Sequence, residues 1–213
     1  MPYQYIVPCI SLLSFIISLI IFFLMYVQPA KLLCRNGPDI MVHYSDFTSG
    51  GSFGLYMPVT FINTSTRIGT VLDAAISIYK IEKPDEIFYI RWRDFIKIDT
   101  DKKKFVTEEL SHALVIPGKS SVYKTVWFLW NSDNPQKFLL EKGSYIMKFY
   151  YWSDNKKYPN CEVNKFVVTD ELYKKVEMFR QEESQGSVKI RLNNEIADNK
   201  LMTKYEVIQL LGK

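Results

Sequence analysis

The sequence predicts a mainly β protein in which one transmembrane helix precedes an antiparallel β-sandwich and an amphipathic helix follows it. Three observations indicate this architecture. Residues 1–30 carry no charged side chain, strand-like alternation fills short segments between residues 38 and 169, and the apolar spacing becomes helical after residue 169. Several short strands without helices between them are typical of an antiparallel β domain.

The N-terminal apolar segment is long enough to cross a membrane. It runs from Ile6 to Val27, and as a helix it would rise about 33 Å, against about 30 Å for the hydrocarbon core of a bilayer. A cleaved signal peptide and a buried helix of a soluble domain are the alternatives. Residues 1–5 lack Lys and Arg and the apolar run is too long for a signal peptide, and its length and lack of charge disfavour a buried soluble helix. We therefore expect a retained single-pass helix over residues 6–28, with the lipid bilayer as its partner.

Positive charges near this span predict its orientation. Lys31 and Arg35 follow the span and no Lys or Arg precedes it, and the cytoplasmic flank of a span carries such residues in excess. This places the C-terminal domain on the cytoplasmic side, with an exported domain as the alternative. Lys31 and Arg35 are also the candidate contacts to anionic lipid. In an exported domain Cys34 and Cys161 could form a disulfide, and the sequence leaves this pairing open.

The chain divides into five predicted regions. They are a short flank (1–5), the transmembrane helix (6–28), a juxtamembrane linker (29–37), the β-sandwich domain (38–169), and a C-terminal helix, strand and short helix packed on the sandwich (170–213). The part after the span has the size of one domain. Its net charge of +4 is too modest for a nucleic-acid-binding surface, so we expect no nucleic-acid partner.

Turn residues separate the predicted strands. The strands are Asp39–Ser45, Gly54–Asn63, Ile68–Ile81, Glu86–Ile98, Leu110–Ile116, Ser120–Trp130, Ser144–Ser153, Cys161–Val168 and, after the helix, Ser187–Asn193. The helix is predicted over residues 170–185, with Thr169 as its N-cap and Gly186 as its stop. A capping box at Thr203 and Glu206 predicts a short terminal helix to Leu211.

One short pattern resembles a corner of immunoglobulin-like and fibronectin type III domains. Leu140, Gly143 and Tyr145 are spaced Leu-x-x-Gly-x-Tyr before a predicted strand, similar to the segment before strand F of those sandwiches. The resemblance implies their fold and a Tyr145 hydroxyl that bonds back to the preceding backbone. The chain departs from the immunoglobulin pattern at Met147, where that pattern has a cysteine. The resemblance implies a fold and no particular function.

The residues that usually carry chemistry form no familiar motif. The two histidines, His43 and His112, have no further His or Cys at a metal-ligand spacing. No glycine-rich loop precedes a helix to hold a phosphate, and a nucleophile pair of Cys161 with a histidine has no local support. We therefore expect no catalytic residue, no cofactor and no metal site, and a protein that is not an enzyme.

Aromatic side chains are the remaining functional signal, at 15% of the chain. Because alternate strand residues point to opposite faces, some of these rings must meet the C-terminal helix, a partner or a ligand. The candidate interaction surface comprises Trp92, Trp127, Trp130, Tyr151 and Trp152. Large aromatics dominate interface energy, which predicts a non-enzymatic protein-interaction or complex-subunit module. The alternative is an exported carbohydrate- or envelope-binding module in which sugars stack on the exposed Trp and Tyr rings.

Overall fold

The computed structural model describes residues 3–23, 27, 29–45, 51–99, 104–154, 156–182 and 186–193. Its elements are α1 (Tyr3–Phe22), β1 (Leu32–Asn36), β2 (Asp39–Ser45), β3 (Ser52–Asn63), β4 (Gly69–Lys80), β5 (Phe88–Asp99), β6 (Lys104–Leu110), β7 (Leu114–Ile116), β8 (Ser121–Trp130), β9 (Gly143–Ser153), β10 (Asn160–Val168), α2 (Asp170–Gln181) and β11 (Ser187–Arg191). The chain is therefore mainly β, and the predicted mainly β class is confirmed.

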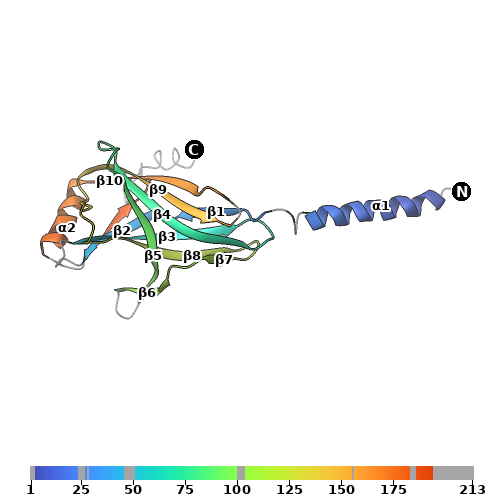
Figure 1. The fold of residues 1–213 in the computed structure, drawn as a ribbon, viewed down its shortest axis with the longest axis horizontal. Coiled ribbons are helices and arrows are strands. Elements are labelled where there is room, and N and C mark those ends of the chain that lie inside the picture. The colour runs from blue at the N-terminus through green and yellow to red at the C-terminus, as the bar shows by residue number, and fades with distance from the viewer. Residues whose placement is uncertain are drawn as a thin grey trace, which may run out of the picture.

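The strands form an antiparallel sheet that curls around a core and nearly closes (Figure 1). Their order is β10-β9-β4-β5-β8-β3-β2-β11, while β1 pairs with β3, β6 with β5 and β7 with β4. The first and last strands of this order approach each other through Asn193, just after β11. Its backbone N–H donates to the Lys165 carbonyl of β10 at 2.7 Å, and its side-chain oxygen accepts from the Lys165 N–H at 2.7 Å.

Strand β5 passes from one half of the sheet to the other. Its first residues, from Phe88 to Arg91, pair with β4, and the residues from Trp92 to Ile96 pair with β8. The register with β8 shifts between Trp92 and Asp94, and such a bulge bends and twists a strand. The bend lets the half built from β3 and β8 lie opposite the half built from β4 and β9.

Phenylalanine rings fill the space between the two halves. Phe149 of β9 lies with its ring centroid 6.3 Å from that of Phe61 of β3 and 6.4 Å from that of Phe128 of β8. All three side chains are fully buried. Full burial of one such side chain stabilises a fold by about 1.5–3 kcal/mol, so these rings hold the two halves together.

Strand β1 lies in segment 29–37, which the sequence predicts as a linker. It pairs with Val59–Asn63 of β3, whereas β2 pairs with Ser52–Tyr56 on the same edge. Between them the Gly37 N–H donates to the Pro58 carbonyl at 2.7 Å. Pro58 therefore lies where β3 changes partner, so its missing N–H costs little.

Strand β6 is a second difference from the predicted strands. The sequence predicts a strand that begins at Leu110, whereas in the structure β6 ends at Leu110 and β7 begins at Leu114. Most of β6 is Lys, Thr and Glu, and of these only Thr favours strands. Its conformation therefore depends on pairing with β5, which the local sequence does not reveal.

Helix α2 begins as the sequence predicts. The Thr169 hydroxyl accepts a hydrogen bond from the Leu172 N–H at 3.3 Å, which caps the helix. The helix ends at Gln181, before the predicted end at 185. Its buried Val176 joins the core, and it packs beside β2 and β11 at the end of the sheet far from α1 (Figure 1). The short helix predicted over 203–211 lies outside the described residues.

Helix α1 extends away from the β domain (Figure 1). Among the residues that the structure describes, no helix has both the length and the apolarity needed to cross a membrane. The structure therefore does not support the predicted span over 6–28, of which residues 24–26 and 28 lie outside the described part.

Candidate functional site

The five aromatic candidates do not form one surface. Trp92 and Tyr151 are 9% and 4% exposed and belong to the core. Trp130 packs its ring 5.2 Å from that of Phe88, and its indole N–H donates to the Gln136 carbonyl at 2.8 Å. The half-buried Trp127 and Trp152 lie outside opposite halves of the sheet, on β8 and β9. Strand alternation separates Trp152 from its buried neighbour Tyr151.

Three other rings and one guanidinium gather around Trp127 on the outer side of the sheet. We call this group the aromatic face, and its members are His43 of β2, Tyr56 of β3, Phe105 of β6, Trp127 of β8 and Arg93 of β5. The His43 ring stacks on Tyr56 at 4.5 Å, and Tyr56 lies 4.5 Å from Phe105 and 6.0 Å from Trp127. The Arg93 guanidinium lies 5.1 Å from the centre of the Trp127 ring.

Gly54 makes room for the His43 ring. The two residues are cross-strand partners, and a Cβ atom on residue 54 would lie 2.1 Å from His43 Cε1. A glycine in the middle of a strand often marks the close approach of another group. The ring therefore extends over the backbone of β3 and reaches Tyr56.

Burial governs the electrostatics of the aromatic face. It lowers the pKa of His43 to about 4, so this imidazole is neutral near pH 7. His43 Nδ1 and Trp127 Nε1 are buried without a hydrogen-bond partner. Asp94 Oδ1 is also unpaired, and Asp94 is the cross-strand partner of Trp127. An unpaired buried polar atom costs about 1–3 kcal/mol, so the aromatic face retains unused hydrogen-bonding capacity.

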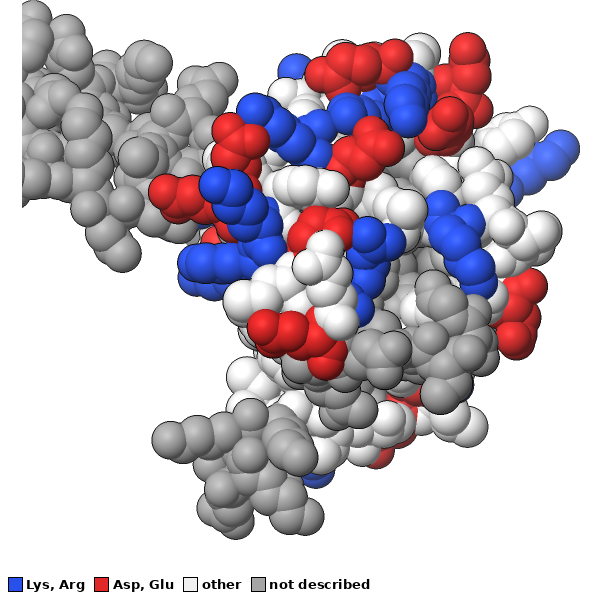
Figure 2. Space-filling model, turned by 90° about the vertical axis from the view of Figure 1, so that its left-hand side faces the viewer, with Lys and Arg blue, Asp and Glu red and all other residues white. Residues whose placement is uncertain are grey.

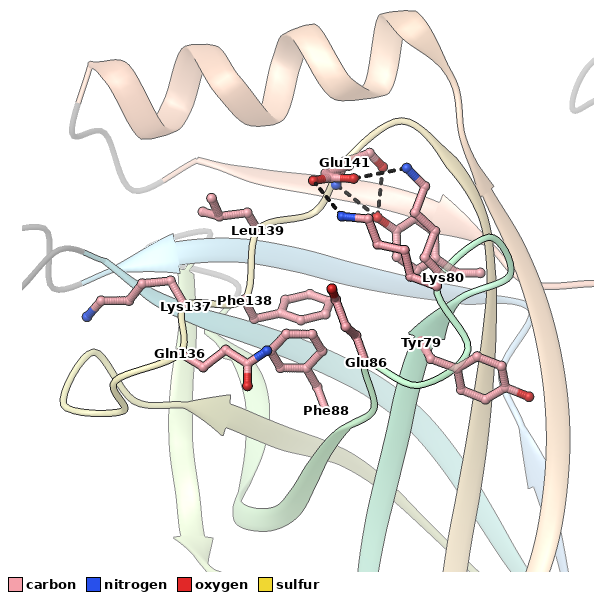
Figure 3. Close-up of a pocket in the computed structure, with 11 residues that line it drawn as sticks. Tyr79, Lys80, Glu86, Phe88, Gln136, Lys137, Phe138, Leu139 and Glu141 are labelled. Atoms are coloured by element: carbon pink, nitrogen blue, oxygen red, sulfur yellow. Dashed lines mark hydrogen bonds and ion pairs between the residues drawn. The ribbon is translucent and has the colours of Figure 1, made fainter.

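A small cavity lies at the end of the sheet near α2, between the β4–β5 turn and the segment that joins β8 to β9 (Figure 3). Its volume is about 140 Å³, whereas pockets for small molecules measure roughly 300–1,000 Å³. The Glu141 carboxylate in its wall accepts from Lys80 Nζ at 3.0 Å, and Lys83 Nζ lies 3.6 Å away. The hydrogen bond from Lys80 lowers the pKa of Glu141. The cavity is therefore suited to water and to the partly exposed ion pairs of its own wall.

Tyr145 forms the predicted corner beside this cavity. Its hydroxyl accepts from the Glu141 N–H at 2.9 Å and donates to the Glu141 carbonyl at 3.0 Å, which confirms the predicted bond to the preceding backbone. Gly143 between them has a φ of 141°, a conformation that favours glycine. Burial raises the pKa of Tyr145 to about 12, so the hydroxyl keeps its proton.

The cysteines are free thiols. Burial raises the pKa of the Cys34 thiol and also that of the more exposed Cys161. A raised pKa leaves little thiolate, the nucleophilic form, near neutral pH. Among the residues in view, no three His, Cys, Asp or Glu side chains are placed to hold a metal ion. The exposed His112 ring packs 5.7 Å from Phe95 instead.

The two lipid-contact candidates are separated along β1. Lys31 directly precedes the strand, and its carbonyl accepts from the Thr64 N–H at 3.0 Å. Arg35 lies four residues further on, about 13 Å along an extended strand. It lies near Glu162, whose pKa is raised by burial and partly lowered again by the Arg35 charge. Lys31 therefore lies closer to α1 than Arg35 does.

Comparison with known proteins adds no relative. No protein-family model and no curated protein matches the chain. Solved structures that are similar to parts of it include a structural-genomics target (7% identity, 82% of this chain and 95% of that chain, TM-score 0.35). A second is a putative ApaA protein from Bordetella pertussis (10% identity, 78% of this chain and 98% of that chain, TM-score 0.32). A third is a FixG-related protein from Vibrio parahaemolyticus (8% identity, 66% of this chain and 96% of that chain, TM-score 0.32). Likenesses this distant carry no argument. The geometry itself defines a mainly β protein with a nearly closed antiparallel sheet.

Proposed function

We propose that this chain is a membrane-attached, non-enzymatic binding module that holds another protein against its aromatic face. The observation that carries the proposal is the aromatic face itself. It places His43, Tyr56 and Trp127 side by side with Arg93 on the outside of a sheet. Tyr, Trp and Arg are the residues that most often dominate the binding energy of protein interfaces.

We further propose that the domain is an immunoglobulin-like sandwich. The pairings β2–β3, β3–β8 and β8–β5 follow the order of strands A, B, E and D, and β4–β9 and β9–β10 follow that of C, F and G. In this assignment Tyr145 begins strand F, where such sandwiches have their tyrosine corner. Sandwiches of this kind commonly display binding surfaces, although the fold alone assigns no partner.

Membrane attachment through residues 6–28 belongs to the same proposal. Between Ile10 and Phe22, the large apolar side chains of α1 are strongly exposed, from 44% at Ile16 to 61% at Ile10, and residues 1–30 carry no charged side chain. Water is a poor solvent for such a surface, whereas lipid chains match it. We place the β domain on the cytoplasmic side. The charges of Lys31 and Arg35 support this side.

The carbohydrate-binding alternative gains no support from the aromatic face. Tyr56 and Trp127 are inclined at 50° to each other, and Tyr56 and Phe105 at 38°. Rings inclined in this way do not form the flat strip on which a sugar would stack. The arrangement of these rings therefore favours a protein partner over a sugar.

Photo-crosslinking in the native cell tests the binding surface. A photoreactive amino acid replaces Leu129, which follows Phe128 on β8 and is the cross-strand partner of Gly54 beside the aromatic face. The matched control replaces Val163 on β10, which is 55% exposed. We expect one discrete protein adduct from position 129 and none from position 163. The adduct should disappear when Trp127→Ala is added and remain when the exposed Tyr123→Ala is added.

Two results would contradict the proposal. One is equal crosslinking from positions 129 and 163. The other is an adduct at position 129 that persists in a folded Trp127→Ala chain, with folding verified by near-ultraviolet circular dichroism. Either result would show that the aromatic face does not select the partner.

A further inference from the structure

We propose that the end of the β domain nearest α1 rests on the headgroups of an anionic lipid bilayer. The inference rests on the membrane attachment proposed above and adds a second lipid contact, formed by turns of the domain itself. We call this surface the basic end. Its members are Lys31, Arg67, Ile68, Lys119, Lys156, Lys157 and Tyr158.

Backbone hydrogen bonds bring these distant segments together. The Thr64 N–H donates to the Lys31 carbonyl at 3.0 Å, and the Lys119 N–H donates to the Ser65 carbonyl at 2.7 Å. The Asp154 N–H donates to the Thr70 carbonyl at 3.2 Å, which ties in the turn between β9 and β10. The β3–β4, β7–β8 and β9–β10 turns therefore share the end of the sheet from which the chain leads back to α1 (Figure 1).

The basic end carries positive charge that carboxylates do not balance. Asp154 is the acidic residue within segments 64–70, 117–120 and 154–160. Across the described part of the chain, none of the five Lys and Arg side chains of the basic end forms an ion pair with a carboxylate. Lys119 Nζ donates instead to the neutral Thr64 carbonyl at 2.6 Å. These cations therefore keep their attraction for an anionic surface.

The opposite end of the domain shows a different charge pattern. Figure 2 shows that end, where acidic and basic side chains are interspersed. Lys142 pairs with Asp170 at 2.7 Å and Arg180 with Glu177 at 2.6 Å. At that end acidic side chains therefore lie among the basic ones, whereas segments 64–70, 117–120 and 154–160 of the basic end hold a single acidic residue, Asp154.

Two apolar side chains complete the basic end. Ile68 is 64% exposed and Tyr158 is 72% exposed, and Lys157 Nζ lies 5.7 Å from the centre of the Tyr158 ring. Tyrosine is enriched where proteins meet lipid headgroups, and cations near an anionic bilayer strengthen its binding. Because the uncharged, exposed α1 joins the domain at this end, the occupant that fits is a bilayer.

The test uses the full chain reconstituted with vesicles of phosphatidylcholine, alone or mixed with phosphatidylserine. Flotation reports attachment through α1, and hydrogen–deuterium exchange of segments 64–70, 117–120 and 156–160 reports contact of the basic end. We expect flotation with both vesicles, and slower exchange of these segments only with phosphatidylserine. High salt should remove that protection because it screens the charges.

Neutralising substitutions locate the contact. Arg67→Gln combined with Lys157→Gln should lose the protection while the chain still floats. The matched control, Lys174→Gln combined with Lys175→Gln on α2, should keep it. Both variants change two cations on exposed segments, and near-ultraviolet circular dichroism verifies that each one is folded.

The outcomes separate this inference from the proposed attachment. If the chain floats with both kinds of vesicle but the three segments exchange equally in each, the proposed lipid contact of the basic end is overturned and the attachment through α1 is still supported. Failure to float with phosphatidylcholine would overturn that attachment. In that case, the contact of the basic end with anionic lipid would still be supported by salt-sensitive binding to phosphatidylserine vesicles, provided that the Arg67 and Lys157 substitutions abolish this binding. If the chain binds neither kind of vesicle, the proposed contact of the basic end is overturned as well.

Discussion

His43 gains its place in the aromatic face from a single glycine. Its ring occupies the space that a side chain on Gly54 would take, and there it stacks on Tyr56. In the sequence His43 is an ordinary strand residue with no ligand partner nearby. The pairing of β2 with β3 converts it into part of a half-buried aromatic cluster on the outside of the sheet.

Acidification from about pH 6.5 to about pH 4 should lower the free energy of unfolding through His43. Burial lowers its pKa to about 4 in the folded chain, whereas an unfolded histidine titrates near 6.5. Between these values only the unfolded chain binds the proton, so stability is lost as the pH falls. Urea unfolding of the detergent-solubilised chain measures this, and His43→Gln should show a shallower fall. Parallel pH profiles of the two proteins would contradict a buried neutral ring.

The corner before β9 shows how one element fixes the next. The segment from 131 to 142 crosses the end of the sheet near α2, and its buried Phe138 and Leu140 close the core there. Tyr145 joins the end of this segment to the start of β9 through two hydrogen bonds to Glu141. The segment is thereby held beside the strand that it precedes.

Tyr145→Phe should lower the free energy of unfolding by about 1–3 kcal/mol, because two hydrogen bonds of about 0.5–1.5 kcal/mol each are lost without a change in ring packing. Urea unfolding followed by tryptophan fluorescence measures the effect. Tyr123→Phe is the matched control: its ring is 63% exposed and its hydroxyl contacts only the nearby Thr125 side chain at 3.3 Å among the described contacts. We expect Tyr123→Phe to lower the free energy of unfolding by less than about 0.5 kcal/mol. Similar losses in the two variants would contradict the role of the corner.

Closure of the sheet is decided at the scale of the whole molecule. Asn193 joins β11 to β10 through its backbone and side chain, and its amide also donates to Asn164 Oδ1 at 2.9 Å. Its φ of 52° lies in the left-handed region, which asparagine tolerates better than most residues. A single residue therefore supplies polar contacts that bring the two ends of the sheet together.

Asn193→Ala should destabilise the fold by about 2–4 kcal/mol, since it loses two side-chain hydrogen bonds and strains the left-handed backbone. Asn193→Gly relieves the strain but loses the same bonds, so it should cost about 1 kcal/mol less. Hydrogen exchange of the β10 and β11 amides should accelerate in both variants. Unchanged exchange in β10 would show that closure does not depend on Asn193.

The sequence by itself determined the features that depend on neighbours along the chain. The alternation of apolar and polar residues located most of the strands, and it predicted β2 with the bounds that the structure shows. It does so because successive side chains of a strand point to opposite faces of the sheet. The N-cap at Thr169 and the corner at Tyr145 were predictable because each involves residues only a few positions apart. The uncharged apolar segment at the N-terminus is also a local property, although membrane attachment stays a proposal.

Only the tertiary structure decided which strands pair and which faces are covered. In the structure Trp92 and Tyr151 are buried and Trp127 is half-exposed. The sequence could not predict this difference, because alternation assigns residues to two faces of a strand but does not indicate which face is covered. It revealed β1 and β6 through their pairing with β3 and β5, and it joined three separate turns into the basic end. Each of these outcomes depends on contacts between residues far apart in the chain, which no local pattern records.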